Sequence, residues 1–399
     1  MAETFNRALS ELNYQTPTPI QVKSIPPILA GRDLVGVAQT GTGKTAAFGL
    51  PLLQTLLAGE RRPGRALPRA LILAPTRELA LQIDEALRRL AAGLPLRTTV
   101  ILGGVGRRPQ VDRLARGTDI VVGTPGRVLD LMQTNDLRLG SVTHFVLDEA
   151  DRMLDLGFIR DIRRIVAALP ARRQSLMFSA TMPEAVARLA AGILTQPLRV
   201  EATPDKITAD RIEQSVYFVR SSDKRALLSR LLTDRAISRT IVFTRTKHSA
   251  SRVAEYLCSG GTAAEALHGN KSQPQRERAL GRFRGGQARV LVATDIAARG
   301  IDVADISHVI NFDLPNVAEA YVHRIGRTAR AGAAGIALSF CDASEIEHLR
   351  GIERLTGAAL RVAGGVPAPA GSGGGARPSG GQARAPQRRH QARRPRRAA

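Results

Sequence analysis

Two polar strings, each placed directly after a short apolar run, restrict the fold of this chain more than any other feature. The first covers residues 38–45 and reads Ala-Gln-Thr-Gly-Thr-Gly-Lys-Thr after the apolar run 34–37. The second covers 148–151 and reads Asp-Glu-Ala-Asp after the run 145–147. In an open parallel sheet, ligands bind beyond the carboxyl ends of the strands, so both strings would lie at one rim. The pair predicts an α/β domain with a nucleotide site at that rim.

The first string has the composition of a phosphate-binding loop. Its glycines lack a Cβ, so the backbone can wrap tightly and point N–H groups at phosphate oxygens, beside the positive N-terminus of the following helix. Lys44 is expected to reach the β- and γ-phosphates, and the Thr45 hydroxyl to ligate Mg²⁺. The usual pattern begins with glycine where this chain has Ala38, and a glycine-rich turn with a surface lysine is the alternative. The residues of the string that we expect to bind the nucleotide are Gln39, Thr40, Gly41, Thr42, Gly43, Lys44 and Thr45.

The second string supplies the carboxylates that ATP hydrolysis needs. Asp148 is expected to bind Mg²⁺, partly through water, and Glu149 to polarise the attacking water. The alternative is a solvated acidic helix start, because Asp and Glu also favour the first turn of a helix. Two independent strings with complementary chemistry favour ATP hydrolysis over that alternative.

Length and charge narrow the class of protein further. The 399 residues suggest two domains of ordinary size and an additional segment. The formal charge of +23 favours a polyanionic partner, nucleic acid before membrane. No stretch has the length and apolarity of a signal peptide or a membrane span, which predicts a soluble cytoplasmic protein without a membrane partner. Cys258 and Cys341 lack metal-ligand spacing and are expected to be buried reduced thiols.

Short β-rich runs alternate with helical patterns along most of the chain, including an amphipathic pattern over 77–90. This alternation predicts parallel sheets covered by helices on both faces. The predicted strands are 34–38, 70–74, 120–123, 145–147 and 176–179, and then 240–244, 290–294, 308–312 and 335–340. The domains that we expect are 1–203 and 211–362, with a linker over 204–210 and a tail over 363–399. The tail carries eight arginines and no acidic residue, cannot bury a core, and is expected to be disordered.

Arginines recur at a spacing of three late in the second predicted domain. Arg324, Arg327 and Arg330 would lie on or beside one helix face. An arginine cluster that faces a triphosphate can stabilise transition-state charge across a domain gap. An ordinary basic helix face on a basic protein is the alternative.

With these ordered motifs, the chain resembles a DEAD-box ATP-dependent RNA helicase over about residues 13–340. The strings at 152–158, 268–273 and 328–332 resemble more narrowly the bacterial RhlE type. The family fold is two tandem RecA-like domains, each a parallel sheet with helices on both faces. The chain departs from the family before the adenine-reading motif, where Asn13 and Tyr14 replace the usual Gly-aromatic pair and Phe5 lies unusually close to Gln21.

The resemblance implies how the nucleotide is recognised. Thr18 and Gln21 match the adenine-reading motif, and an amide can offer the paired donor and acceptor that adenine requires. Asp302 would contact the ribose. Arg327 and Arg330 would be arginine fingers that complete the catalytic set of Lys44, Asp148 and Glu149.

The resemblance also implies how hydrolysis acts on RNA. Ser179 and Thr181 would couple hydrolysis to strand separation by bonding the acidic string when the domains close on RNA. The residues that would contact the RNA backbone without reading bases are Arg77, Gly104, Thr124, Arg127, Arg245, Gly269, Gln273 and Thr294. Such a clamp would unwind short duplexes or remodel RNA–protein particles, with roles in ribosome assembly or RNA decay. A DNA helicase or translocase, and an RNA-binding scaffold that uses ATP only as a clamp signal, are the alternatives.

Overall fold

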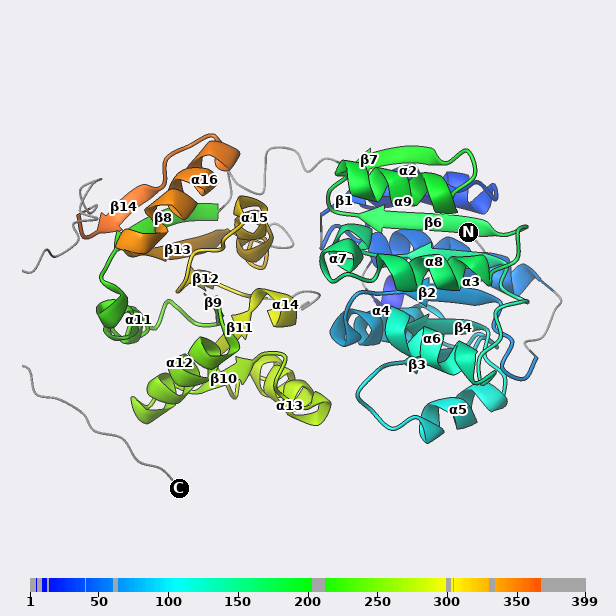
Figure 1. Ribbon diagram of the computed structural model, residues 1–399, viewed down its shortest axis with the longest axis horizontal. Helices are drawn as coiled ribbons and strands as arrows, with labels where there is room; N and C mark the ends of the chain where they lie inside the picture. The colour runs from blue at the N-terminus through cyan, green and yellow to red at the C-terminus, as the bar shows by residue number, and fades with distance from the viewer. Residues whose placement is uncertain are drawn as a thin grey trace, which may run out of the picture.

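The computed structural model describes residues 5, 9–12, 14–39, 41–59, 64–202, 212–298, 303, 305–329 and 334–366. The predicted linker, nearly all of the predicted tail, and the predicted site residues Thr40, Asp302 and Arg330 lie outside these ranges. Two α/β domains lie side by side, and each is built on one seven-stranded sheet (Figure 1).

The first sheet has the strand order β3-β4-β2-β5-β6-β1-β7, and its paired strands are parallel. Its strands are β1 (Leu34–Ala38), β2 (Ala70–Leu73), β3 (Thr98–Ile101), β4 (Ile120–Gly123), β5 (His144–Leu147), β6 (Gln174–Ser179) and β7 (Leu198–Ala202). The sequence predicted the five inner strands and missed the two at the edges, β3 and β7. Because β7 alternates buried and exposed residues, it lacks the continuous apolar run of an inner strand.

Helices cover both faces of the first sheet. They are α2 (Pro19–Leu29), α3 (Lys44–Ala58), α4 (Arg77–Leu90), α5 (Arg108–Ala115), α6 (Pro125–Gln133), α7 (Ala150–Asp155), α8 (Ile159–Ala167) and α9 (Glu184–Ile193). Helices α2, α3 and α4 pack against Ile72 and its neighbours, whereas α6 to α9 pack against Leu71 and Leu73 on the other face. Phe5 is fully buried in the first of these cores. Helix α4 confirms the predicted amphipathic helix, and its N-cap Thr76 accepts a bond from the N–H of Leu79 at 3.3 Å.

The second sheet has the order β10-β11-β9-β12-β13-β8-β14 and is also parallel. Its strands are β8 (Ile212–Phe218), β9 (Thr240–Thr244), β10 (Ala264–Leu267), β11 (Val290–Thr294), β12 (His308–Asn311), β13 (Gly335–Cys341) and β14 (Arg361–Gly364). The order repeats that of the first sheet strand for strand, with β8 in the place of β1 and β14 in the place of β7. The predicted fold class, two tandem α/β domains with parallel sheets, is confirmed.

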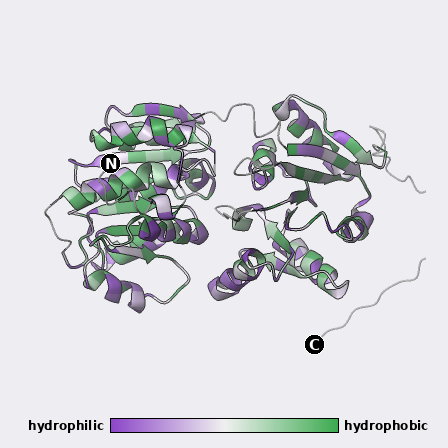
Figure 2. Ribbon diagram, turned by 180° about the vertical axis from the view of Figure 1, so that it is seen from behind, coloured by the Kyte–Doolittle hydropathy of each residue, from purple (hydrophilic) through white to green (hydrophobic). Residues whose placement is uncertain are grey.

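The second domain is covered by a matching set of helices. They are η1 (Ser221–Asp223), α11 (Lys224–Leu231), α12 (Lys247–Ser259), α13 (Gln273–Arg284), α14 (Asp295–Ala298), α15 (Ala318–Ile325), η2 (Ala343–Glu345) and α16 (Ile346–Thr356). Helices α11 and α12 pack on one face, whereas α13 and α14, and α15 and α16, form two further cores. Figure 2 shows hydrophobic residues gathered on the inner strands of both domains and hydrophilic residues on the outer helices.

The two cysteines differ in burial. Cys341 is buried, as expected, but Cys258 is exposed because it lies on the outer side of α12. The prediction of a buried thiol was therefore wrong for Cys258. Among the described residues, no helix combines the length and apolarity needed to cross a membrane.

Candidate functional site

The phosphate-loop string connects β1 to α3 and ends in a left-handed turn. Gly41 and Gly43 have φ angles of +84° and +88°, which L side chains rarely adopt. A Cβ on Gly43 would also lie 2.5 Å from Nε2 of Gln21. Gly43 is the N-cap of α3, whose first-turn N–H groups have no partner within the helix. The turn therefore presents the N-terminus of a helix to an anion.

Gln21 lies on the first turn of α2 and is 3% exposed. Its Oε1 accepts a hydrogen bond from the backbone N–H of Thr18 at 2.9 Å, and its Nε2 donates to the carbonyl oxygen of Gly43 at 3.2 Å. The side chain thus joins the start of α2 to the end of the phosphate loop. A movement of the loop on nucleotide binding would therefore change the hydrogen bond that Gln21 makes to Gly43.

Lys44 and Glu149 are charged residues buried next to the phosphate loop and in the acidic string. Lys44 is 6% exposed and Glu149 is 3% exposed. Within the described part of the chain, neither Nζ of Lys44 nor Oε2 of Glu149 has a hydrogen-bond partner. A buried charge without a partner is strongly unfavourable, so this arrangement is typical of a site that a charged ligand completes.

Asp148 and Glu149 follow β5, and their carboxylates repel each other. Burial raises the pKa of Asp148 to about 6; the positive charge of Lys44 opposes this rise and the negative charge of Glu149 adds to it. Glu149 has a φ of +57°, a left-handed conformation that is uncommon for a residue with a side chain. A divalent cation would relieve the repulsion between the carboxylates. The all-oxygen donor set of the Asp148 carboxylate and the Thr45 hydroxyl fits Mg²⁺.

Ser179 and Thr181 follow β6 and bond the last residue of the acidic string. Both the N–H and the hydroxyl of Thr181 donate to Oδ2 of Asp151, at 3.0 and 2.9 Å. Oγ of Ser179 accepts from the N–H of Asp151 at 3.2 Å and donates to the carbonyl oxygen of Thr181 at 2.7 Å. The two hydroxyl residues therefore contact the acidic string through Asp151.

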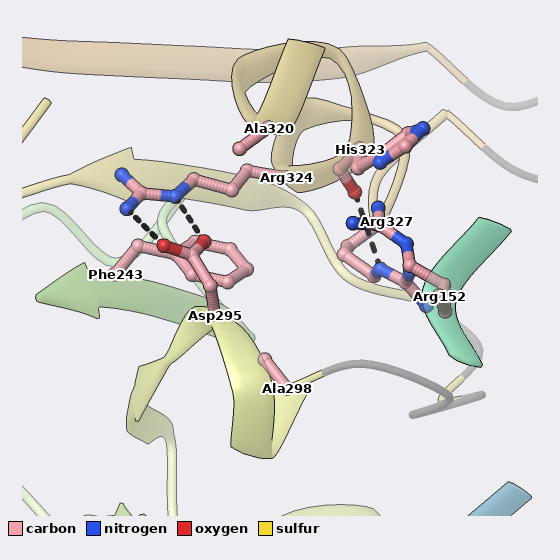
Figure 3. A pocket seen from close by; sticks show the side chains of 8 residues that line it. All are labelled: Arg152, Phe243, Asp295, Ala298, Ala320, His323, Arg324 and Arg327. Carbon is pink, nitrogen blue, oxygen red and sulfur yellow. Dashed lines mark hydrogen bonds and ion pairs between the residues drawn. The ribbon is translucent and has the colours of Figure 1, made fainter. Parts of the chain in front are cut away.

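Residues of both domains line one pocket (Figure 3). Its lining residues are Arg152 from α7 and, from the second domain, Phe243, Asp295, Ala298, Ala320, His323, Arg324 and Arg327. Figure 3 shows Arg152, His323 and Arg327 gathered at one end and the Arg324–Asp295 pair at the other. Arg327 is 5% exposed, and its Nε donates to the carbonyl oxygen of His323 at 3.3 Å. The second domain thus presents Arg327 toward the end of the acidic string.

We expected Arg324, Arg327 and Arg330 to form one cluster that faces a triphosphate, and this prediction is wrong for Arg324. Its guanidinium binds both oxygens of Asp295, at 2.5 and 2.7 Å, and lies 5.0 Å from the ring centroid of Phe243. Arg324 is only 2% exposed because it points into its own domain. Helix α15 ends at Ile325, so Arg327 lies beyond the helix.

The predicted RNA-contact residues of the first domain gather around the loop after β3. Arg77 lies against Gly104, which has a φ of +71° and where a Cβ would overlap the guanidinium. Arg127 donates from Nη2 to the carbonyl oxygen of Val105 at 3.3 Å. The N–H of Thr124, the N-cap of α6, donates to the end of β3 at 3.2 Å. All four predicted residues are therefore brought together.

Their predicted counterparts in the second domain lie after neighbouring strands. Arg245, Gly269 and Thr294 stand at or just after the ends of β9, β10 and β11, which are adjacent in the sheet. Gln273 begins α13, and its Oε1 accepts a bond from Nη1 of Arg77 at 3.3 Å. The structure thus joins predicted RNA contacts of both domains.

A second contact across the domains was not predicted. Arg276 of α13 forms an ion pair with Glu78 of α4 at 2.9 Å, and both side chains are largely buried. Burial and then the positive charge of Arg276 lower the pKa of Arg77, which lies in the same cluster. The sequence held a signal for this pair. Glu78 directly follows the predicted contact Arg77, and Arg276 lies one helical turn after the predicted contact Gln273.

Comparison with known proteins decides the family. The DEAD/DEAH box helicase model matches residues 18–189, and the helicase conserved C-terminal domain model matches 223–332. The DEAD-box ATP-dependent RNA helicase CshA of Geobacillus kaustophilus is 43% identical over 356 residues, 89% of this chain and 75% of the relative. The chain belongs to the DEAD-box ATP-dependent RNA helicases.

Two further relatives place this helicase in its family. The ATP-dependent RNA helicase CshA of Listeria monocytogenes is 43% identical over 354 residues, 89% of this chain and 67% of the relative. The solved structure of S. cerevisiae Dbp5 bound to RNA and ADP BeF3 is 33% identical, with a TM-score of 0.81 over 91% of this chain and 94% of that one. The DEAD-box helicase described here is therefore an ATP-dependent enzyme built from two RecA-like domains.

Proposed function

We propose that this helicase separates short RNA duplexes, or remodels RNA–protein particles, by closing its two domains on RNA with ATP. The observation that carries the proposal is that Lys44 Nζ and Glu149 Oε2, buried beside the left-handed phosphate loop, have no hydrogen-bond partner among the described residues. A triphosphate would neutralise Lys44, and a water or cation would satisfy Glu149.

Each nucleotide-site residue has a proposed task. The loop 39–45 holds the phosphates through its backbone N–H groups and Lys44. Thr45 and Asp148 would hold Mg²⁺, which when bound neutralises charge on the phosphates. Glu149 polarises the attacking water, and Gln21 with Thr18 binds the adenine edge.

The second domain supplies the remaining groups. Arg327 and Arg330 would stabilise the charge of the transition state, and Asp302 would bind the ribose. Ser179 and Thr181 transmit the state of the acidic string to the RNA side, which is supported by their bonds to Asp151. Hydrolysis therefore requires both domains, and contacts that exist only in the closed state link it to RNA.

RNA would bind along the two groups of predicted contacts, one in each domain. The bond of 3.3 Å between Arg77 and Gln273 supports this path, because side chains that contact each other across the domains could bind neighbouring groups of one RNA strand. Contacts to the backbone without base readout make the binding independent of sequence. The arginine-rich tail over 363–399 would add salt-dependent affinity.

The finer assignments belong to the same proposal. The RhlE type rests on the strings at 152–158, 268–273 and 328–332, although the relatives compared are named CshA. The domain limits 1–203 and 211–362 with a linker over 204–210, the cytoplasmic location, and a role in ribosome assembly or RNA decay are proposed on the sequence alone.

Steady-state ATPase activity with and without single-stranded RNA tests the proposal, with matched DNA and GTP as controls. We expect RNA to stimulate ATP hydrolysis strongly, and DNA and GTP to be poor substitutes. Equal stimulation by DNA would favour the translocase alternative. Binding of RNA and ATP without turnover would favour the scaffold alternative.

A further inference from the structure

A buried lysine of the second domain lies among three carboxylates that the ATP site does not use. Lys224, at the start of α11, is 1% exposed. Its Nζ lies 2.6 Å from Oε2 of Glu345, 3.2 Å from Oδ2 of Asp342 and 3.6 Å from Oδ1 of Asp313. Buried ion pairs are often no more stable than apolar side chains of similar volume, so stability alone is a weak explanation for this cluster.

The second oxygen of Glu345 holds an arginine. Oε1 accepts from Nη2 of Arg245 at 2.7 Å and from the N–H of Leu314 at 3.1 Å. Nη2 of Arg245 also donates to the carbonyl oxygen of Leu314 at 3.2 Å, and the backbone N–H of Arg245 donates to Oδ2 of Asp313 at 2.8 Å. Glu345 therefore bridges Lys224 on one oxygen and Arg245 on the other.

The cluster ties together the segments that follow four neighbouring inner strands of the sheet, at their carboxyl ends. Arg245 follows β9, Asp313 follows β12, Asp342 and Glu345 follow β13, and Lys224 follows β8. The side chains of Lys224 and Glu345 are 2% exposed, and those of Asp342 and Asp313 are 13% and 18% exposed. The side chain of Arg245 is 38% exposed, so the cluster presents this one cation at its surface.

Two nitrogens of the Arg245 guanidinium are left to donate to a ligand. Both of its side-chain bonds to described residues come from Nη2. The Nε and Nη1 donors make no bond to a described residue, and each can donate a single hydrogen bond to a phosphate oxygen. An arginine held in place loses less side-chain freedom on binding than a mobile one.

We propose that Glu345, fixed by Lys224, is a positioning residue for RNA binding that holds Arg245 ready for an RNA phosphate. The inference rests on the proposed role of Arg245 as an RNA contact. Glu345 itself touches neither RNA nor nucleotide. Its loss should weaken RNA binding through Arg245 and leave ATP binding unchanged.

The test is the RNA concentration that gives half-maximal ATPase stimulation of the full chain, measured together with KM for ATP. The variants are Arg245→Ala, Glu345→Ala, Glu345→Gln and the double variant Arg245→Ala/Glu345→Ala. We expect Glu345→Ala to raise the half-maximal RNA concentration about three- to tenfold, the cost of freeing one long side chain, with KM for ATP unchanged. In the Arg245→Ala background, Glu345→Ala should have no further effect. Glu347→Ala, in the exposed neighbouring ion pair with Arg350, is the matched control.

Three results would overturn the inference: an unchanged RNA requirement in Glu345→Ala, an equal rise in KM for ATP, or an undiminished effect in the Arg245→Ala background. If Glu345→Ala does not fold, Glu345→Gln decides, with an expected rise of about two- to threefold because the amide still accepts a bond. If Arg245→Ala alone leaves the RNA requirement unchanged, Arg245 is not an RNA contact, and both its proposed role and this inference fail. If only the Glu345 variants are silent, the RNA site stands and this inference alone is wrong.

Discussion

The two domains share one strand order but differ in how the buried charges near their sites are held. In the first domain, Lys44 and Glu149 are buried with terminal atoms that have no partner among the described residues. In the second, two buried cations, Lys224 and Arg324, are held by carboxylates at hydrogen-bond distance. The same fold therefore serves two tasks. The first domain is incomplete without a charged ligand, whereas the second is a finished scaffold that presents arginines to it.

The largest expected effect comes from removing the unpartnered carboxylate. Glu149→Gln should lower kcat for ATP about 10²- to 10⁴-fold, because the amide cannot accept a proton from the attacking water. Binding of ATP should persist, since the phosphate loop and Lys44 are unchanged. Single-turnover hydrolysis and equilibrium nucleotide binding separate the two effects. Glu184→Gln, an exposed carboxylate on α9, is the control. Normal turnover in Glu149→Gln would mean that another group activates the water.

Removing the carboxylate of a buried ion pair in the second domain should instead destabilise that domain. Asp295→Ala leaves the Arg324 guanidinium buried without its carboxylate, and we expect a loss of about 3 to 5 kcal/mol of domain stability. Hydrogen exchange of the β11 and β12 amides measures this loss in the second domain alone. Glu347→Ala breaks the exposed pair with Arg350 and should cost less than about 1 kcal/mol. Similar losses in the two variants would show that burial of Arg324 does not matter.

The pH dependence of stability should differ between Asp148→Asn and the unaltered protein. The folded state raises the pKa of Asp148 from 3.8 to about 6, so it binds this proton more tightly than the unfolded chain does. Stability should therefore fall as pH rises through this window, by up to about 3 kcal/mol. Asp148→Asn cannot lose a proton and should gain stability relative to the unaltered protein between pH 4 and pH 7.

Melting of the first domain at several pH values, without nucleotide, checks this expectation. Adding Mg²⁺ and ATP should reverse the trend, because the ligand site requires the carboxylate. Parallel melting curves for the two proteins across the window would mean that Asp148 is already ionised at low pH.

How far the sequence predicts this molecule depends on how local each signal is. The inner strands that are continuous apolar runs were predicted, whereas the edge strands were missed, as in β14, where three of four residues are exposed. The inner strand β8 was missed as well, because polar residues interrupt its apolar ones. The phosphate loop and the acidic string were found because their chemistry lies in adjacent residues. The pairing of Arg324 with Asp295, 29 residues away, carries no local signal, so the arginine cluster was assigned one shared role. The Glu78–Arg276 pair and the Lys224 cluster depend on tertiary contacts in the same way.

The smallest expected effect tests the contrast between the domains most directly. Lys44→Met replaces a buried ammonium, which has no hydrogen-bond partner in the described part of the chain, with an apolar chain of similar length. Without nucleotide, we expect the first domain to gain about 1 kcal/mol of stability, because the cost of burying this ammonium without a hydrogen bond is only partly offset by its attraction to Asp148. Hydrogen exchange of the β1 and β6 amides reports this domain. Lys23→Met, whose exposed ammonium bonds the carbonyl oxygen of Glu201, should change stability by less than about 0.5 kcal/mol.

Nucleotide should invert the order of the Lys44 variants. ATP stabilises the folded state in proportion to its affinity, so the unaltered protein should gain stability on binding and Lys44→Met should gain little. If Lys44→Met is less stable than the unaltered protein even without nucleotide, the ammonium is already satisfied in the empty site. The contrast between the domains would then be lost, and the buried charge of Lys44 would not explain why the site favours nucleotide binding.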